Sequence, residues 1–185
     1  EDGTFTMPAE NVTFTATWEK DAADWNDVIY LPGSEDGDVQ GLPSNVTDQL
    51  SGTTQTVGQD APTRHGYTFD GYKVEGLDGT ASLQPGATFT MPAGDVTLTA
   101  QWKVDAADWN DVIYLPGSDD GDVTGMPDNV EDVLSGTEQT RSAAEPERHG
   151  YTFKGWELTS PDGLEVAEDG TFTMPAENVT FTATW

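Results

Sequence analysis

The chain carries one stretch of sequence twice, at its start and at its end. The sequence EDGTFTMPAENVTFTATW forms residues 1–18 and returns unchanged as residues 168–185, and a drifted copy, PGATFTMPAGDVTLTAQW, forms residues 85–102. Self-similarity at a fixed spacing is the signature of a tandem array, in which small folded units follow one another along the chain. Such arrays usually serve reach, spacing or valency, and they seldom carry chemistry.

A second recurring stretch defines where the units begin and end. The sequence DAADWNDVIYLPGS runs over residues 21–34 and recurs letter for letter over residues 105–118. We therefore expect one repeat over 19–102 and a second over 103–185, each an autonomously folding unit. Residues 1–18 are expected to be the C-terminal hairpin of a preceding, truncated repeat.

The acidic composition limits the partners of the chain. There are 34 Asp and Glu against 7 Lys and Arg, so the formal net charge is −27. Nucleic acids and anionic membrane surfaces attract Lys and Arg, so both are poor partners for such a field. No cysteine is present and no apolar run approaches the ~20 residues of a membrane span. We expect no disulfide, no nucleic-acid partner and no direct membrane insertion.

Alternation of polar and apolar residues predicts β-strands at the end of each repeat. The stretch 88–91 alternates, and so does the stretch 96–102, in which Val96, Leu98 and Trp102 share one face. A short connection, 92–95, joins the two, so we expect a hairpin that closes each repeat. Further strands are expected over 67–74, broken by a glycine, and over 28–31, as a central strand.

One segment in each repeat has the features of a short helix. Residues 45–50 follow a proline and a serine and precede a glycine, and residues 129–134 repeat this pattern with Asp128 as the expected N-cap. The predicted fold class is mainly β (α+β). Each repeat is expected to have four or five strands and one short helix, and the repeats are expected to follow one another as a rod. The segments 57–61 and 141–145 differ between repeats and are expected to be exposed loops.

The alternating positions also predict the core. They are apolar or aromatic residues of the expected strands, and their counterparts lie one period later. In the first repeat they are Tyr67, Phe69, Val74, Phe89, Met91, Val96, Leu98 and Trp102.

The C-terminal half of each repeat resembles a known family. The pattern "P-x-R-x-GYTFxGW/Y … G-x-TFTMPAxxVTxTAxW", over 62–102 and again over 146–185, is similar to the Listeria–Bacteroides repeat, the module of internalin B-repeats. The length of the unit and its N-terminal half resemble the SHIRT repeats of streptococcal surface stalks. These resemblances imply a small, partly β-grasp-like module of a secreted or cell-wall-anchored fibrous protein. They bring no catalytic residue.

Two motifs are candidates for metal binding. The acidic turn over Asp36–Asp38, repeated over Asp120–Asp122, offers carboxylates that could bind Ca²⁺, but it lacks the ligand spacing of a dedicated calcium loop. We interpret it as an acidic turn and leave calcium as the alternative. His65 and His149 have no second histidine or cysteine beside them and are expected to lie in surface turns. We assign no catalytic, cofactor-binding or metal-binding residue, and we expect no cofactor.

The tryptophans allow two interpretations. Trp18, Trp102 and Trp185 end the repeat units, and Trp25 and Trp109 each follow shortly after a terminal tryptophan. They could form a platform for sugars, but the alternation that places Trp102 on the apolar strand face favours core and junction roles. We expect Trp102 and Trp109 to clamp the junction between the repeats.

Two functions fit these observations, and an enzyme does not, because no catalytic set appears in both copies. The first is a spacer, a stiff rod of repeats that projects another domain from a bacterial surface. The second is an adhesive module that binds a host protein or glycan many times over. In both cases the expected location is extracellular, and the first expected partners are the neighbouring repeats of the same chain.

Overall fold

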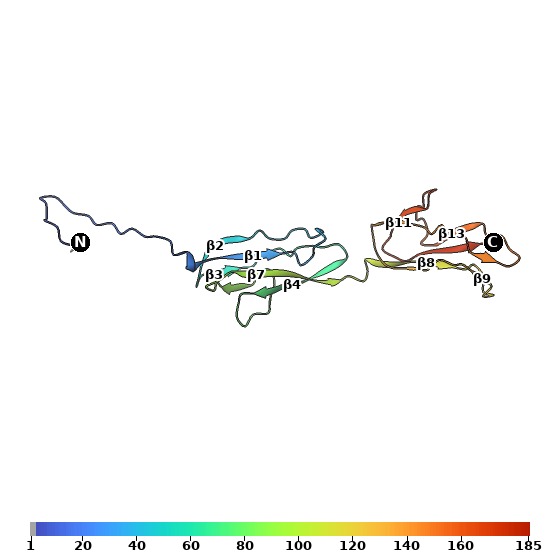
Figure 1. The fold of residues 1–185 in the computed structure, drawn as a ribbon, viewed down its shortest axis with the longest axis horizontal. Coiled ribbons are helices and arrows are strands. Elements are labelled where there is room, and N and C mark those ends of the chain that lie inside the picture. The colour runs from blue at the N-terminus through green and yellow to red at the C-terminus, as the bar shows by residue number, and fades with distance from the viewer. Residues whose placement is uncertain (1–2) are drawn as a thin grey trace.

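The structure, a computed structural model, describes residues 3–185. Two β-sheet units follow each other along one long axis, and residues 3–18 extend from the first unit as an irregular segment that doubles back on itself (Figure 1). Each unit has its own cluster of buried apolar side chains. The expected tandem array of mainly β units is confirmed.

The first repeat is built on a mixed sheet of five strands in the order β2-β1-β7-β4-β5. The first and last long strands lie side by side and parallel, with Val28 opposite Val96 and Tyr30 opposite Leu98, whereas the other pairs are antiparallel. A strand bound on both sides in this way loses its unpaired edge, so β7 is the central element of the unit. The bounds are β1 Trp25–Leu31, β2 Val46–Leu50, β4 Tyr67–Glu75, β5 Ser82–Leu83 and β7 Val96–Val104.

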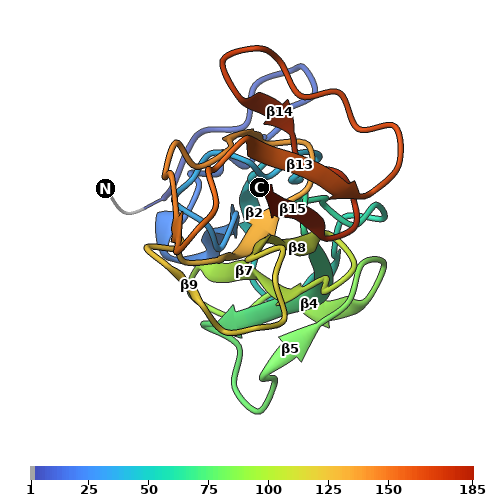
Figure 2. The ribbon, with the colours of Figure 1, turned by 90° about the vertical axis from the view of Figure 1, so that its right-hand side faces the viewer.

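The second repeat has the same arrangement, with the order β10-β8-β15-β13. Its parallel pair again joins the first and last long strands, and Phe181 lies opposite Tyr114. The equivalent strands β4 and β13 lie on opposite sides of the long axis, so the second repeat is rotated about that axis relative to the first (Figure 2). The bounds are β8 Trp109–Leu115, β10 Val130–Leu134, β13 Gly155–Ser160 and β15 Val179–Thr184.

The expected hairpin is wrong in both repeats. Strand β6 (Thr88–Thr90) pairs with β3 (Thr54–Thr56), and β14 (Thr171–Thr173) pairs with β11 (Glu138–Thr140), in separate two-stranded ladders. The alternation along these strands is real, but β7 and β15 are already hydrogen-bonded on both edges, so neither can accept a third partner. A further short pair joins β9 (Val123–Thr124) and β12 (Glu147–Arg148).

The expected helix is also wrong. Residues 46–50 and 130–134 are strands β2 and β10, each antiparallel to the first strand of its sheet. Asp128 therefore caps no helix, and the next residue, Asn129, accepts a hydrogen bond at its Oδ1 from Tyr114 N at 2.9 Å across the sheet. Asp48 and Asp132 have φ of 58° and 55°, and they form bulges that interrupt the alternation and imitate a helical pattern.

Helix is nearly absent from the part of the chain that the structure describes. A single turn of 3-10 helix, η1 (Ala22–Asp24), precedes β1. A β-grasp fold packs a helix across its sheet, so the expected β-grasp arrangement is not confirmed. Within residues 3–185 no helix has the length and apolar character needed to cross a membrane.

Most of the expected core is confirmed. Val74, Phe89, Met91, Val96 and Leu98 are buried in the first repeat, whereas Phe69 and Trp102 are partly buried against them. The remaining buried side chains of this cluster lie on β1, on β4, on β7 and just after β3, and they are Val28, Tyr30, Tyr72, Ala100 and Val57. Val57 is 1% exposed, so the expectation of an exposed loop beginning there is wrong at its first residue.

Residues 3–18 have no strand, so the hairpin expected there is wrong too. The bend at Ala9–Glu10 matches the bend at Ala176–Glu177 in the identical segment of the second repeat. The rings of Phe5 and Phe14 also keep an edge-to-face contact, with centroids 5.3 Å apart and an interplanar angle of 65°. Phe14 is nevertheless 77% exposed, whereas its counterpart Phe181 is 1% exposed.

Candidate functional site

The junction between the two repeats brings together residues that are far apart in the sequence. Strand β7 ends at Val104 and β8 begins at Trp109, so only residues 105–108 connect the two units (Figure 1). They form a turn in which Asp108 N donates to Asp105 O at 3.0 Å and Ala107 N donates to Asp105 Oδ1 at 3.2 Å. A connection this short, with its own internal hydrogen bonds, is not a flexible linker.

The carbonyl oxygen of Gly66 accepts hydrogen bonds from residues at both ends of the turn 105–108. It accepts a hydrogen bond from Asp105 N at 2.9 Å and another from the indole Nε1 of Trp109 at 2.9 Å. Gly66 has φ of +78°, and a Cβ built there would lie 2.5 Å from Leu134 Cδ1 and 3.0 Å from Trp109 Nε1. Glycine therefore serves here both for its backbone conformation and for the close approach of the second repeat.

Two aromatic rings carry the contact from one repeat to the next. Tyr67 and Trp109 meet edge to face, with centroids 5.9 Å apart and an interplanar angle of 79°. The guanidinium of Arg64 lies on the Tyr67 ring, 3.9 Å from its centroid. Aromatic and cation–π pairs of this kind each contribute about 0.5–1.5 kcal/mol, so Tyr67 is held firmly in place for Trp109.

The acidic turn fixes Arg64. Its Nε donates to Asp38 Oδ2 at 2.6 Å and its Nη2 donates to Asp36 Oδ2 at 2.7 Å, while Ser34 Oγ donates to Asp38 Oδ1 at 2.9 Å. The hydrogen bond from Arg64 holds the pKa of Asp38 below its ordinary value of 3.8, although partial burial opposes that shift. Asp36 and Asp38, the two carboxylates considered above as calcium ligands, therefore bind the guanidinium of Arg64 in this structure.

The second repeat contains the same arrangement of two aspartates around one arginine, which we call the acidic clamp. Arg148 donates to Asp122 at 2.8 Å and to Asp120 at 2.9 Å, and it lies 3.9 Å from the centroid of the Tyr151 ring. The hydrogen bond from Arg148 lowers the pKa of Asp122, against a smaller opposing effect of burial. The ring that the clamp presents is more exposed here, since Tyr151 is 56% exposed whereas Tyr67 is half-buried under Trp109.

The remaining side of the junction belongs to the turn before β8. Ser135 N donates to Asp108 O at 2.8 Å, and Ser135 Oγ donates to Asp108 Oδ1 at 3.2 Å. The same pair of bonds joins Ser51 to Asp24 at the start of the first repeat. The start of each repeat is therefore fixed by the same pair of hydrogen bonds.

The expectation that Trp102 clamps the junction is wrong, whereas that of Trp109 is confirmed. Trp102 lies within the first repeat, where it packs on Phe69 at a centroid distance of 5.6 Å and donates from Nε1 to Pro32 O at 2.8 Å. Trp185 makes the same bond to Pro116 O at 2.9 Å. The core interpretation of these two tryptophans agrees with their positions, whereas Trp18 is 92% exposed.

The two histidines singled out in the sequence lie in exposed turns, and only His65 is at the junction. His65 is exposed in the turn beside Gly66, and His149 occupies the equivalent exposed place in the second repeat. The roles of Arg64 and of the Gly66 carbonyl were missed. A signal was present, because Arg64, Asp36 and Asp38 all recur one period later as Arg148, Asp120 and Asp122.

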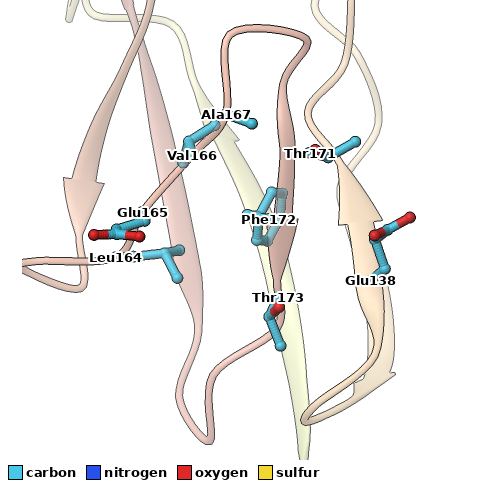
Figure 3. A pocket seen from close by; sticks show the side chains of 8 residues that line it. All are labelled: Glu138, Leu164, Glu165, Val166, Ala167, Thr171, Phe172 and Thr173. Atoms are coloured by element: carbon cyan, nitrogen blue, oxygen red, sulfur yellow. The ribbon is translucent and has the colours of Figure 1, made fainter.

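The second repeat also has a surface hollow of about 630 Å³ between β14 and the segment 164–167 (Figure 3). Phe172 and Leu164 line it, and the carboxylates of Glu138 and Glu165 at its sides point away from each other. A ligand site gathers a few polar groups toward one point, which these side chains do not do. At the matching positions of the first repeat Glu138 is replaced by Thr54 and Leu164 by Ala81.

The chain matches the sequence model of the divergent InlB B-repeat domain over residues 1–22, 29–106 and 113–185. The chain belongs to this family. Internalin H of Listeria monocytogenes is 32% identical over 148 residues, a match that covers 79% of the chain and 24% of internalin H. A Gly-rich protein of Evansella cellulosilytica is 29% identical over 189 residues, covering 96% of the chain and 19% of that protein. The chain thus spans about a fifth to a quarter of the length of these relatives.

A solved structure of SHIRT domains 3-4 from a cell surface protein also matches this InlB B-repeat chain. The match covers 87% of the chain and 96% of that structure, with 16% sequence identity and a TM-score of 0.40.

Within residues 3–185 no three His, Cys, Asp or Glu side chains form a group that could hold a metal ion.

Proposed function

We propose that this pair of InlB B-repeats is a spacer segment of an extracellular bacterial surface protein, which projects a functional domain away from the cell. Residues 19–102 and 103–185 are two such units in this proposal, and residues 1–18 are the end of another. The observation that carries it is the junction, where Gly66 O binds both Asp105 N and Trp109 Nε1.

The charge of the chain supports an extended array. Every repeat is acidic, so neighbouring repeats repel one another when the array bends back, although physiological salt screens this repulsion beyond roughly 8 Å. Stiffness at close range must then come from direct contacts such as that of Tyr67 with Trp109. Repeats joined by identical junctions add a constant increment of length, as in other quasi-one-dimensional repeat proteins.

Small-angle scattering on proteins with two, four and six repeats tests the proposal. We expect the maximum dimension to rise linearly with the number of repeats. Replacing the tryptophan equivalent to Trp109 by alanine at every junction should move the growth toward the square root of that number. Growth near the square root in the unmodified proteins would mean a flexible string and would contradict a spacer.

The alternative function is an adhesive module that binds a host protein or glycan. Multivalent adhesion by an array needs the same binding surface on each repeat, and two of the residues that line the hollow around Phe172, Glu138 and Leu164, are replaced in the first repeat. A binding assay of the chain against immobilised matrix proteins and glycans separates the two functions. Saturable binding at micromolar concentration would favour adhesion.

A further inference from the structure

We propose that the parallel pair of β1 and β7 bears tension along the array, and that a side-chain hydrogen bond at each end of the pair raises the force at which a repeat unfolds. The inference goes beyond the spacer function, because an adhesin that holds its ligand transmits tension through the same strands. The first and last long strands of a repeat are hydrogen-bonded directly to each other. A chain under tension is pulled at the two ends of every repeat, so the load reaches these two strands first.

The direction of the two strands determines how the pair is loaded. β1 begins at the end of the unit away from the second repeat, and β7 ends at the junction (Figure 1). Because the strands are parallel, tension pulls β1 backward and β7 forward, so that they slide past each other. The evenly spaced hydrogen bonds of a parallel pair then share the load and must break together. Bonds in a pair that is peeled from one end break one after another, at a lower force.

Sliding of the strands would also disturb the core. Tyr30 of β1 lies opposite Leu98 of β7, and Val28 lies opposite Val96. All four side chains belong to the buried cluster of the first repeat. A slip of one residue would turn these side chains to the other face of the sheet, since side chains alternate along a strand. The pair therefore cannot relieve tension by a small change of register.

A side-chain hydrogen bond extends the ladder at each end of the pair. At one end, Asp95 Oδ1 accepts a hydrogen bond from Asp27 N at 2.7 Å. At the other end, Trp102 Nε1 donates to Pro32 O at 2.8 Å. We call these the end bonds. Each joins the segment that tension pulls backward to the segment that it pulls forward, so both are loaded together with the ladder.

The loop after the first strand is packed tightly on the last strand in both repeats. Gly33 has φ of +65°, and a Cβ built there would collide with Ala100 O. Gly117 has φ of +62°, and a Cβ built there would collide with Ala183 O. This close passage of the chain over the last strand places the proline carbonyl before each glycine within reach of the terminal tryptophan.

The second repeat has the same strand pair and the same end bonds. β8 and β15 are parallel, and Asn178 Oδ1 accepts a hydrogen bond from Asp111 N at 2.8 Å. Trp185 Nε1 donates to Pro116 O at 2.9 Å. The accepting residue is an aspartate in the first repeat and an asparagine in the second. The two repeats therefore share the hydrogen bond and not the charge.

Single-molecule pulling on the full-length chain tests the proposal. The chain has no cysteine, so two introduced cysteines define where the handles attach. Handles at Ala23 and Ala106, which are both exposed, make the strands slide. Handles at Ala23 and Ala93, which is also exposed, hold the strands at the same end and peel them apart.

We expect the first repeat to unfold at a severalfold higher force in the sliding geometry than in the peeling geometry. Forced unfolding reports the barrier to unfolding and not the equilibrium stability. Denaturant unfolding should therefore give the two cysteine variants the same stability. This comparison needs no substitution that could prevent folding, because all three handle positions are exposed alanines.

Substitutions at the end bonds extend the test. Asp95→Ala removes the acceptor for Asp27 N and should lower the force in the sliding geometry. Asp95→Asn is the matched control and should leave that force unchanged, because the second repeat makes the same bond with an asparagine. Trp102→Phe removes the donor to Pro32 O but keeps an aromatic ring. It should lower the sliding force more than the peeling force, because peeling from the opposite end reaches this bond last.

Equal unfolding forces in the two geometries would overturn the proposal, because the direction of the strands would then have no influence on the force. The role of the end bonds is overturned if Asp95→Ala and Asp95→Asn unfold at the same force in the sliding geometry. Neither result would change the outcome of the scattering test of the spacer, since scattering measures length in the absence of tension.

Discussion

Residues 3–18 and residues 170–185 have the same sequence and different structures. In the second repeat this sequence forms β14 and β15 and is largely buried, whereas at the start of the chain it forms no strand. The bend and the contact between the two phenylalanines are common to both. The bend and the ring contact therefore form from the segment's own sequence, whereas its strands form only within a complete repeat.

The strand structure of residues 170–185 depends on the rest of the repeat. β15 obtains its hydrogen bonds from β8 and β13, which belong to earlier parts of the repeat. An isolated pair of strands is marginal in water, and residues 3–18 lack even that pairing. Strand structure here is therefore a property of the complete repeat.

Truncating the same phenylalanine in the two copies should have very different effects. Phe181→Ala removes a fully buried ring and should reduce the free energy of unfolding of the second repeat by about 3–5 kcal/mol. Phe14→Ala changes an exposed side chain and should stay within about 0.5 kcal/mol of the unmodified chain. Denaturant unfolding at low micromolar concentration measures both. Equal effects would mean that residues 3–18 are packed as tightly as residues 170–185.

The two tryptophans that precede the first strands form a second matched pair. Trp109→Ala loses the hydrogen bond to Gly66 O and the contact with Tyr67, which together correspond to about 1–3 kcal/mol. Trp25→Ala loses the contact with the Lys20 ammonium, worth about 0.5–1 kcal/mol at an exposed site. Calorimetry should show that Trp109→Ala also separates the melting transitions of the two repeats. Transitions unchanged by Trp109→Ala would contradict the junction described here.

Two glycines sharpen the comparison further. Gly66 and Gly150 both have positive φ, so alanine should cost about 1–2 kcal/mol at either position. Only at Gly66 would the new Cβ meet the other repeat, and at Gly150 nothing lies within 4 Å. Gly66→Ala should therefore cost about 1 kcal/mol more than Gly150→Ala and should broaden the interrepeat distances measured between spin labels. Identical effects would show that the second repeat does not approach Gly66 closely.

Lowering the pH should reduce the stability of both repeats in the same way, whereas the substitutions above affect the two copies differently. The pKa of Asp38 and of Asp122 is lowered by the arginine of each clamp. A carboxyl whose pKa is lower in the folded state stabilises that state above its unfolded pKa, near 4, and loses this contribution as the pH falls through the folded pKa. Asp122→Asn should lower the melting temperature of the second repeat slightly at pH 7. That difference should shrink as the pH falls below about 4 through the lowered pKa of Asp122, and a difference that stays constant with pH would exclude the clamp.

The period, the strands over 28–31, 67–74, 88–91 and 96–102 and most of the core could be predicted from the sequence because they depend on local alternation and recurrence. Strand partners could not. The hairpin over 88–102 was expected because its strands are close in sequence, but the central strand β7 is taken by β1 and β4. The bulge at Asp48 imitated a helix for the same reason, since its cause is the pairing with β1.

The junction was only half predictable. The spacing of Trp109 from Trp102 indicated a contact between repeats, and Trp109 makes it. The surface that receives Trp109 is the turn at Gly66, which lies far earlier in the chain. Recurrence of Arg64 with its two aspartates was the available sign that this turn is fixed in place.

Amide hydrogen exchange on the two copies of the shared sequence shows whether the strand forms without the rest of the repeat. In a dilute solution of the monomeric chain, the amides of residues 180–184 should exchange at least about 10³-fold more slowly than their intrinsic rates, because they belong to a central strand that opens only with the repeat. The amides of residues 13–17, which have identical side chains and neighbours, should exchange close to their intrinsic rates. Comparable protection of both segments would show that the sequence forms its strand without the repeat, contrary to the dependence of β15 on β8 and β13.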